Sequence, residues 1–169
     1  KELKRHEPFQ LSEQEKKEGF QILFDGTNMH EWQGNTVDYV LEDGCIAMNP
    51  SKSFGGNLYT KKEYANFVYR FEFQLTPGAN NGIGLRTPMG VDAAYHGMES
   101  QILDCEHPIY KDITPLQHHG SIYGIIPANE NHKKAIKPVG EWNEEEIICD
   151  GDNIKVTVNG IVIVEGNIR

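Results

Sequence analysis

Residues 98–108 combine a strand-like alternation with an unusual density of polar groups. Small and apolar residues alternate with Glu99 and Gln101, and this period of two is typical of a β-strand with one apolar and one polar face. Asp104 follows just beyond the regular part of the alternation. Two carboxylates and an amide within so short a span could move protons and bind hydroxyl groups. We therefore take this stretch as the first candidate for a catalytic site.

In a regular strand, Asp104 has the wrong parity to share the face of Glu99 and Gln101. A β-bulge near Leu103 would insert one residue and turn the Asp104 carboxylate onto that face, and bulges are common beside active sites. The alternative is that the strand ends at Leu103 and that its polar residues line a solvated outer face. The residues alone leave both interpretations open.

A second candidate surface lies in residues 80–86. Asn80, Gly82, Gly84 and Arg86 share one parity in this expected strand. Glycine weakens a strand interior and often marks a place where a ligand or another backbone approaches closely. We interpret the segment as a binding floor that ends in a cation, with a bulge or tight packing as the alternative.

Further candidates come from two long stretches, 104–120 and 127–142, which we expect to be functional loops. Lys137 and Trp142 place a cation and an aromatic ring near the end of the second stretch. An indole ring has a flat apolar face that suits a sugar ring, although a core tryptophan is an equal alternative. We also expect Tyr123 to point into a cleft beside Ser121.

Histidines flank the acidic strand in the sequence, at His96 and at His118 and His119. Imidazole and carboxylate groups together can bind a divalent metal, although histidines in loops are more often solvated or hydrogen bonded. We name His96, Asp104 and His118 as candidate metal ligands. Whether a metal is needed stays open.

Composition excludes several classes of function. The chain has 169 residues, of which 38% are hydrophobic and 24% charged, and its net charge is −9. Nucleic acid is not an expected partner, because its binding depends on phosphate neutralisation by basic clusters. No apolar run reaches membrane-spanning length. The three cysteines have no zinc-ligand spacing and indicate no disulfide framework, although one pair could still bridge. The composition says nothing about the oligomeric state.

The remaining pattern predicts an all-β fold. Ser12 and Glu15 form a capping box that starts a short helix over about 13–18. The rest of the chain shows many short alternating runs, and Asn159-Gly160 is a strong hairpin signal. About a dozen short strands separated by turns indicate a β-sandwich or barrel. We expect an N-terminal arm and helix over 1–18 and one β-sandwich domain over 19–169.

Several segments of the chain resemble the bacterial 3-keto-disaccharide hydrolase family, which was first catalogued as a domain of unknown function. These segments follow the family's order along nearly the whole chain. They are Glu18 to Phe20, Leu23 to Gly26, Trp32, Tyr64 to Phe73, Asn81 to Arg86, Gly97 to Asp104, Gly120 to Gly124, Lys137 to Asn143 and Asn159-Gly160.

The resemblance implies a concanavalin A-like jelly-roll sandwich of two antiparallel sheets. Glu99, Gln101 and Asp104 also stand where laminarinase-type glucanases carry a Glu-x-Asp-x-x-Glu signature. The central acid is an amide here and the last acid is shorter, so double-displacement chemistry is not expected. Family members usually continue beyond the Asn-Gly hairpin, so we expect the domain to lack its last strand or strands.

The resemblance further implies a carbohydrate substrate that is oxidised at C3 of a hexose. A C3 ketone makes the C2 proton acidic, so a base can form an enolate that expels the C1 substituent, after which water adds. This chemistry needs a base, an acid and a group that stabilises the enolate. We expect these roles to fall as follows: Glu99 or His119 as base, Asp104 as acid or metal ligand, Arg86 or Lys137 at the enolate, Gln101 on a sugar hydroxyl and Trp142 against the ring.

Two alternatives belong to other classes of function. A direct glycoside hydrolase would use two carboxylates, with Glu99 paired to Asp104 or Glu141. A carbohydrate-binding module would need aromatic and amide contacts but no titrating group. Because members of the family are commonly exported, the resemblance also implies a periplasmic or cell-envelope location.

Overall fold

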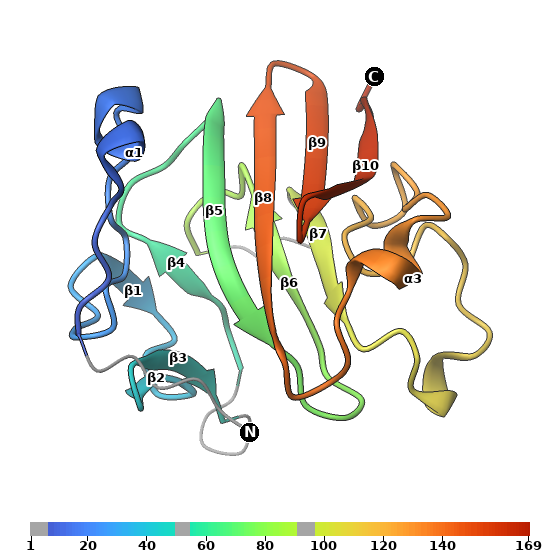
Figure 1. Cartoon of the computed structure of the whole chain (residues 1–169), viewed down its shortest axis with the longest axis horizontal. Helices are drawn as coiled ribbons and strands as arrows, with labels where there is room; N and C mark the ends of the chain where they lie inside the picture. Colours follow the sequence, from blue (N-terminus) through green and yellow to red (C-terminus); the bar gives the residue numbers. More distant parts are fainter. Residues whose placement is uncertain (1–6, 50–54, 91–96) are drawn as a thin grey trace. The chain divides into compact units, whose positions relative to one another are not determined.

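Short strands with alternating burial make up most of the regular structure (Figure 1). The structure is a computed structural model that describes residues 7–49, 55–90 and 97–169. Its elements are α1 (Glu13–Glu18), β1 (Trp32–Gly34), β2 (Tyr39–Glu42), β3 (Cys45–Met48), β4 (Leu58–Thr60), β5 (Phe67–Gln74), β6 (Asn80–Leu85), β7 (Met98–Leu103), η1 (Pro108–Tyr110), α3 (His132–Ala135), β8 (Trp142–Asp150), β9 (Asn153–Val158) and β10 (Ile161–Asn167).

The short N-terminal helix is confirmed with both of its predicted ends. The Ser12 hydroxyl accepts a hydrogen bond from the Glu15 backbone N–H, and the Glu15 carboxylate accepts one from the Ser12 N–H. Gly19 ends the helix with a φ of 86°, a left-handed conformation that costs glycine little. This boundary is therefore encoded locally.

The described residues fall into two compact units, one that ends at Glu63 and one from Tyr64 to Arg169. In the first unit, β1 pairs with β4 and β2 pairs with β3, both antiparallel. The Trp32 indole N–H donates to the Leu23 carbonyl at 2.9 Å, so this ring is fixed within its own unit. The division into an arm and a single domain beginning at residue 19 stays a prediction.

The second unit contains a four-stranded antiparallel sheet in the order β10-β9-β8-β5 and the β6-β7 ladder. On β5 the aromatic residues from Phe67 to Phe73 face inward, as the alternation predicts. One apolar cluster joins residues of both layers, including Leu85 of β6 and Ile147 of β8. In Figure 1, β6 and β7 lie behind the sheet that contains β8 and β9. The two layers therefore enclose the core of this unit.

A third chain segment, residues 119–123, runs along the other edge of β7. Ser100 bridges to Ile122, and both side chains are fully buried. The Gln101 carbonyl accepts from the Gly120 N–H while the Gln101 N–H donates to the Ser121 carbonyl. Two residues therefore oppose one, which is the geometry of a β-bulge. A turn over residues 123–125 follows this bulged segment.

The predicted all-β sandwich is confirmed, although its strands separate into several ladders rather than two continuous sheets. The short helix α3 was not predicted, because a single turn carries no helical periodicity. No disulfide joins the three cysteines, all of which lie in the described ranges. Among the described residues, no helix has the length and apolar character that crossing a membrane would require.

Candidate active site on the outer face of β7

Glu99 and Gln101 lie on the face of β7 that is turned away from the sandwich interior. Their neighbours Met98, Ser100 and Ile102 face the core, and Ser100 has no exposed surface. The register pairs Gly84 with Glu99 and Gly82 with Gln101. The glycine floor and the polar residues of β7 therefore form one surface, with Asn80 exposed at its end.

The absence of a side chain at Gly82 leaves room for the Glu99 side chain. A Cβ atom on Gly82 would lie 2.5 Å from both the Cγ and the Cδ atoms of Glu99. The Glu99 side chain thus lies directly across Gly82, where any larger residue would occupy the same space. This close approach is the reason for a glycine inside the strand.

Gln101 is 5% exposed, and its amide is only half satisfied. Its Nε2 atom donates to the Gln117 carbonyl at 3.4 Å. Its buried Oε1 atom has no hydrogen-bond partner among the described residues. A buried polar atom without a partner costs free energy, so this oxygen is a natural acceptor for a ligand hydroxyl.

Tyr123 lies beside Glu99 on the third segment of this layer. Its backbone N–H donates to the Glu99 carbonyl at 2.8 Å. Because Ile122 points into the core, Tyr123 points to the outer face, where its side chain is 47% exposed. The Gln117 amide nitrogen donates to the Tyr123 hydroxyl at 3.3 Å. Gln117 was not among the predicted site residues, because nothing in its local pattern marks a loop amide as a neighbour of this strand.

Asp104 does not join this surface. The register between β6 and β7 runs without a shift up to the pair of Asn80 and Leu103, so the bulge expected near Leu103 is absent from this ladder. The buried Asp104 carboxylate accepts from the Gly78 N–H at 2.9 Å. It stabilises the turn before β6, which does not support its predicted role as acid or second carboxylate.

The two predicted enolate stabilisers and the predicted sugar platform lie elsewhere. The Arg86 guanidinium donates to the Ala65 carbonyl and to the Asn66 side chain. Trp142 pairs with Gln74 and shares the outward parity of β8, so it lies on the outer face of the opposite layer. Lys137 is exposed in the loop before β8. The structure does not bring these three residues to Glu99.

His119 lies inside the sandwich, where a substrate on the outer face of β7 cannot reach it. Its ring has no exposed surface and stacks on Phe73, with 4.9 Å between the ring centroids. The Leu103 N–H donates to Nδ1 at 3.2 Å, so the neutral ring carries its hydrogen on Nε2, which lies 2.6 Å from Glu145 Oε1. The predicted role of His119 as base is therefore not supported.

Glu145 was missed, although its parity with Ile147 and Cys149 could have indicated a carboxylate on the core face of β8. The side chains of Glu145 and His119 are both fully buried. Desolvation raises the pKa of Tyr69 to about 12, and the negative charge of Glu145 acts in the same direction. Removing one member of such a pair typically costs about 3–5 kcal/mol. We assign the pair to the architecture of the core.

The predicted metal ligands do not form a cluster in the described part of the chain. His96 lies outside the described residues. His118 stacks on His132 with 4.2 Å between ring centroids, and Asp104 is bound to the turn. Within residues 7–49, 55–90 and 97–169, no group of three or more His, Cys, Asp or Glu side chains could hold a metal ion. Asp104 and His118 therefore do not fit a shared site.

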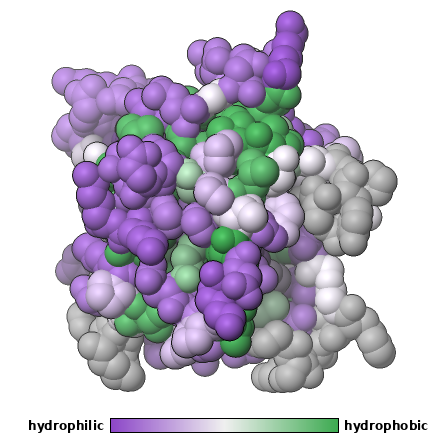
Figure 2. All heavy atoms as spheres, turned by 90° about the vertical axis from the view of Figure 1, so that its right-hand side faces the viewer, coloured by the Kyte–Doolittle hydropathy of each residue, from purple (hydrophilic) through white to green (hydrophobic). Residues whose placement is uncertain are grey.

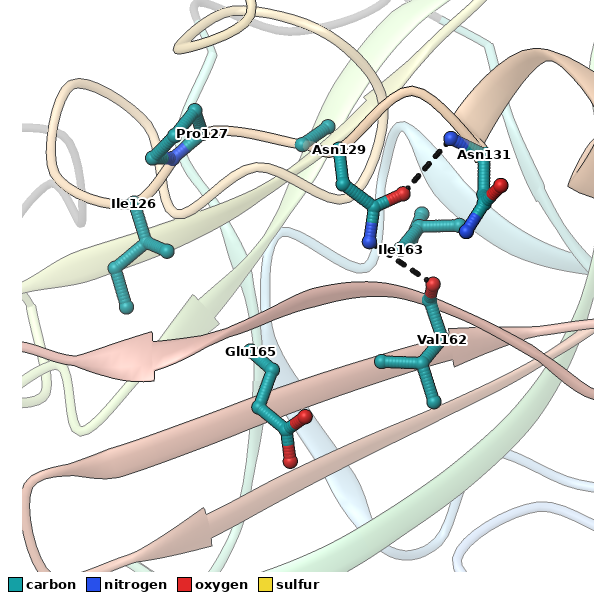
Figure 3. Close-up of a pocket in the computed structure, with 8 residues that line it drawn as sticks. Ile126, Pro127, Asn129, Asn131, Val162, Ile163 and Glu165 are labelled. Carbon is teal, nitrogen blue, oxygen red and sulfur yellow. Dashed lines mark hydrogen bonds between the residues drawn. The ribbon is translucent and has the colours of Figure 1, made fainter.

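A separate hollow of about 500 Å³ lies between the loop from Ile126 to Asn131 and the edge strand β10 (Figure 3). Its Asn129 side chain is already bonded, donating to the Val162 carbonyl and accepting from the Asn131 N–H. Glu165 is its only titratable lining residue among those described. This hollow offers little chemistry, so it is a weaker candidate than the Glu99 surface.

The side of the molecule that carries α3 and the loops between β7 and β8 is mostly hydrophilic, with apolar patches between the polar groups (Figure 2). Leu116, Tyr123 and Ile125 are exposed hydrophobic residues of these loops. The Leu116 carbonyl accepts from the Ser121 hydroxyl and from the Gly124 N–H, which ties the two loops together. Such mixed surfaces suit a sugar, which has apolar faces and a polar rim.

The second unit is thus a two-layer antiparallel β-sandwich that carries a carboxylate, a buried amide and an exposed tyrosine on one outer face. The sequence profile of the 3-keto-alpha-glucoside-1,2-lyase-like domain family matches residues 19–169. The chain belongs to this family, which confirms the resemblance drawn from its segments.

Individual relatives agree with this assignment. A 3-keto-disaccharide hydrolase from Bacteroides thetaiotaomicron is 29% identical over 161 residues, which cover 78% of this chain and 52% of the relative. Two crystal structures from Parabacteroides distasonis ATCC 8503, both described as a "putative glycosyl hydrolase", are also similar. One has 32% identity, a TM-score of 0.60 and coverage of 65% of this chain and 55% of the other.

The second crystal structure has 22% identity and a TM-score of 0.78, and the alignment covers 95% of this chain and 78% of the other. At this identity the likeness supports the fold alone. The chain spans about half of the length of the curated relative and of the first crystal structure.

Proposed function

We propose that this chain belongs to a carbohydrate-active enzyme that cleaves the glycosidic bond of a 3-keto-glycoside or 3-keto-disaccharide. The observation that carries the proposal is that the Glu99 carboxylate lies across Gly82, on the face of β7 that also carries Gln101 with its unpartnered oxygen, while the Tyr123 backbone donates to the Glu99 carbonyl from the neighbouring segment. The name of the Bacteroides relative supports the substrate class. One carboxylate next to acceptors and donors for sugar hydroxyls suits elimination better than a two-carboxylate mechanism.

In this mechanism Glu99 removes the proton at C2 of the sugar. The electron pair of the C2–H bond passes into an enolate, whose charge rests on the oxygen at C3. When the C3 carbonyl forms again, a double bond forms between C1 and C2 and the bond from C1 to the leaving oxygen breaks. The proton held by Glu99 passes to that oxygen. Water then adds across the C1–C2 double bond, so that its oxygen bonds to C1 and a proton returns to C2. Gln101 holds a sugar hydroxyl through its Oε1 atom.

Direct hydrolysis is the weaker alternative because its second carboxylate lacks a suitable position. One candidate for it, the Asp104 carboxylate, is buried and accepts a hydrogen bond from the Gly78 N–H. The other candidate, Glu141, directly precedes β8. This strand belongs to the four-stranded sheet, which is the layer opposite β7. Inverting and retaining enzymes both need two carboxyl groups that flank one bond.

The test is turnover of a 3-keto-glycoside and of its unoxidised parent by the wild type, by Glu99→Gln and by Glu106→Gln. Glu106 is an exposed acid seven positions further along the same stretch, so it is a matched control. Glu99→Gln should lower kcat by about 10²–10⁴-fold, the usual contribution of a general base. Glu106→Gln should keep wild-type turnover, and both variants should melt normally.

Cleavage of the parent glycoside at the same rate as of the 3-keto-glycoside would contradict the proposed chemistry and favour direct hydrolysis. Sugar binding without any product would favour a binding module. The same assays with a chelator decide whether a divalent metal takes part, since its removal would silence a metal-dependent enzyme.

A further inference from the structure

Gln117 is linked to two of the polar groups on the outer face of β7. Its backbone carbonyl accepts from Gln101 Nε2 at 3.4 Å, and its side-chain Nε2 donates to the Tyr123 hydroxyl at 3.3 Å. The Gln117 side-chain oxygen accepts from the Thr114 backbone N–H at 3.0 Å. The loop over 114–117 therefore connects the buried amide to the exposed tyrosine.

These bonds fix which side-chain atom of Gln117 is nitrogen. A backbone N–H can only donate, so the atom facing Thr114 must be the amide oxygen. The other atom, which faces Tyr123, is then the NH₂ group, which can only donate. The Tyr123 oxygen is consequently an acceptor in this pair, and its own hydrogen is left to point to another group.

The hydrogen bond to Gln117 likewise fixes which side-chain atom of Gln101 is nitrogen. A backbone carbonyl can only accept, so the atom of Gln101 that faces the Gln117 carbonyl is the NH₂ group. The Gln101 oxygen then remains as a buried acceptor, with no partner among residues that the structure describes. This face therefore has one exposed hydroxyl donor, at Tyr123, and one buried amide acceptor, at Gln101.

We propose that the Tyr123 hydroxyl donates a hydrogen bond to the C3 ketone oxygen of the substrate and that Gln117 is the positioning residue that leaves this hydrogen available. The inference rests on the proposed function. A 3-keto sugar is complementary to this polarity, because its ketone oxygen only accepts and the hydroxyl groups beside it can donate. Tyr123 thereby takes the role that we predicted for Arg86 or Lys137, which lie elsewhere.

In the reaction the Tyr123 hydrogen bond strengthens as Glu99 removes the C2 proton and charge develops on the C3 oxygen. The tyrosine keeps its proton throughout, and the proton taken by Glu99 goes to the leaving oxygen. Loss of one such donor to a developing oxyanion typically lowers kcat by about 10²–10³-fold. An unoxidised glycoside has a hydroxyl instead of the ketone and gains no such stabilisation.

The experiment combines Tyr123→Phe, which removes only the hydroxyl, with Gln117→Glu, which keeps the side-chain shape. In Gln117→Glu one carboxylate oxygen still accepts from Thr114, and the other now accepts the Tyr123 hydrogen. Each variant should lower kcat on a 3-keto-glycoside by about 10²-fold or more, with a much smaller change in KM. The double variant should be no slower than Tyr123→Phe, because both changes remove the same hydrogen bond.

The affinity for the 3-keto-glycoside and for its parent, measured by calorimetry, separates this inference from the proposed function. Normal turnover by Tyr123→Phe, or independent effects of the two substitutions, would overturn the inference and leave the function intact. A wild type that prefers to bind the 3-keto sugar without cleaving it, and loses that preference in Tyr123→Phe, would support the inference and overturn the function. A wild type that neither binds nor cleaves it would overturn both.

Discussion

Replacing Gly82 by Ala should displace the Glu99 carboxylate without disrupting the sheet. The new Cβ atom would lie 2.5 Å from Cγ and Cδ of Glu99, whereas ordinary contacts begin at 3.4 Å. The Glu99 side chain must therefore move by about 0.9 Å. It can do so by rotating, because the overlap involves the far end of a flexible side chain and not the backbone of β7.

Activity and stability should respond very differently to this change. A misplacement of about 1 Å in a reacting group can cost about 10²-fold in rate, so kcat on a 3-keto-glycoside should fall by about that factor. Ala is better than Gly in a strand interior by about 0.5–1 kcal/mol, which offsets the cost of moving Glu99. The free energy of unfolding should consequently stay within about 1 kcal/mol of the wild-type value.

The matched control is Gly151→Ala in the turn between β8 and β9. Gly151 has a φ of 58° and open space around its missing Cβ, so this substitution should cost about 1–2 kcal/mol of stability and leave kcat unchanged. Steady-state turnover and urea unfolding of both variants measure the two effects. Wild-type turnover by Gly82→Ala would show that the placement of Glu99 across Gly82 does not matter for catalysis.

Two further predictions concern stability and are measured by urea unfolding. Gly120→Ala should cost about 2–5 kcal/mol, because Gly120 has a φ of 83° and a Cβ atom there would overlap Ile163 Cδ1. Gly124→Ala should cost only about 1–2 kcal/mol, since Gly124 has a φ of 73° but open space around it. Equal losses of stability in the two variants would contradict the packing argument. Desolvation and then the charge of His132 lower the pKa of His118 below its ordinary 6.5, so the unfolded chain takes up this proton first. The resulting loss of stability should be absent well above pH 6.5 and grow as the pH falls below it; His118→Asn should flatten this part of the pH profile, and an unchanged slope would refute the assignment.

Features that depend on nearest neighbours were predictable from the sequence. The capping box of Ser12 and Glu15 and the stop at Gly19 define α1 through hydrogen bonds that span only a few residues. The aromatic alternation from Phe67 to Phe73 defines the inner face of β5 in the same local way. These elements formed as expected because their local preference agrees with their tertiary environment.

The position of the bulge was not predictable, because a bulge belongs to a pair of strands and not to one sequence. The broken alternation at Asp104 suggested an insertion in β7, but the insertion lies opposite Gln101, at Gly120 and Ser121. Gly120 allows this bulge, because it has a φ of 83° and because a Cβ atom there would overlap Ile163 Cδ1. The bulge turns the His119 side chain into the core, where it contacts Glu145, a partner that was not predicted.

The members of the site were harder to predict for a reason that lies in the sandwich itself. Periodicity tells whether a residue points inward or outward, but a sandwich has two outward faces, and both give the same pattern. Glu99 and Trp142 are both outward, yet one belongs to β7 and the other to β8 of the opposite layer. The partners of Glu99 must therefore come from its own layer and the loops attached to it, which is where Gln101 and Tyr123 lie. A single sequence contains no signal for this choice, since it is made by strand pairing between distant segments.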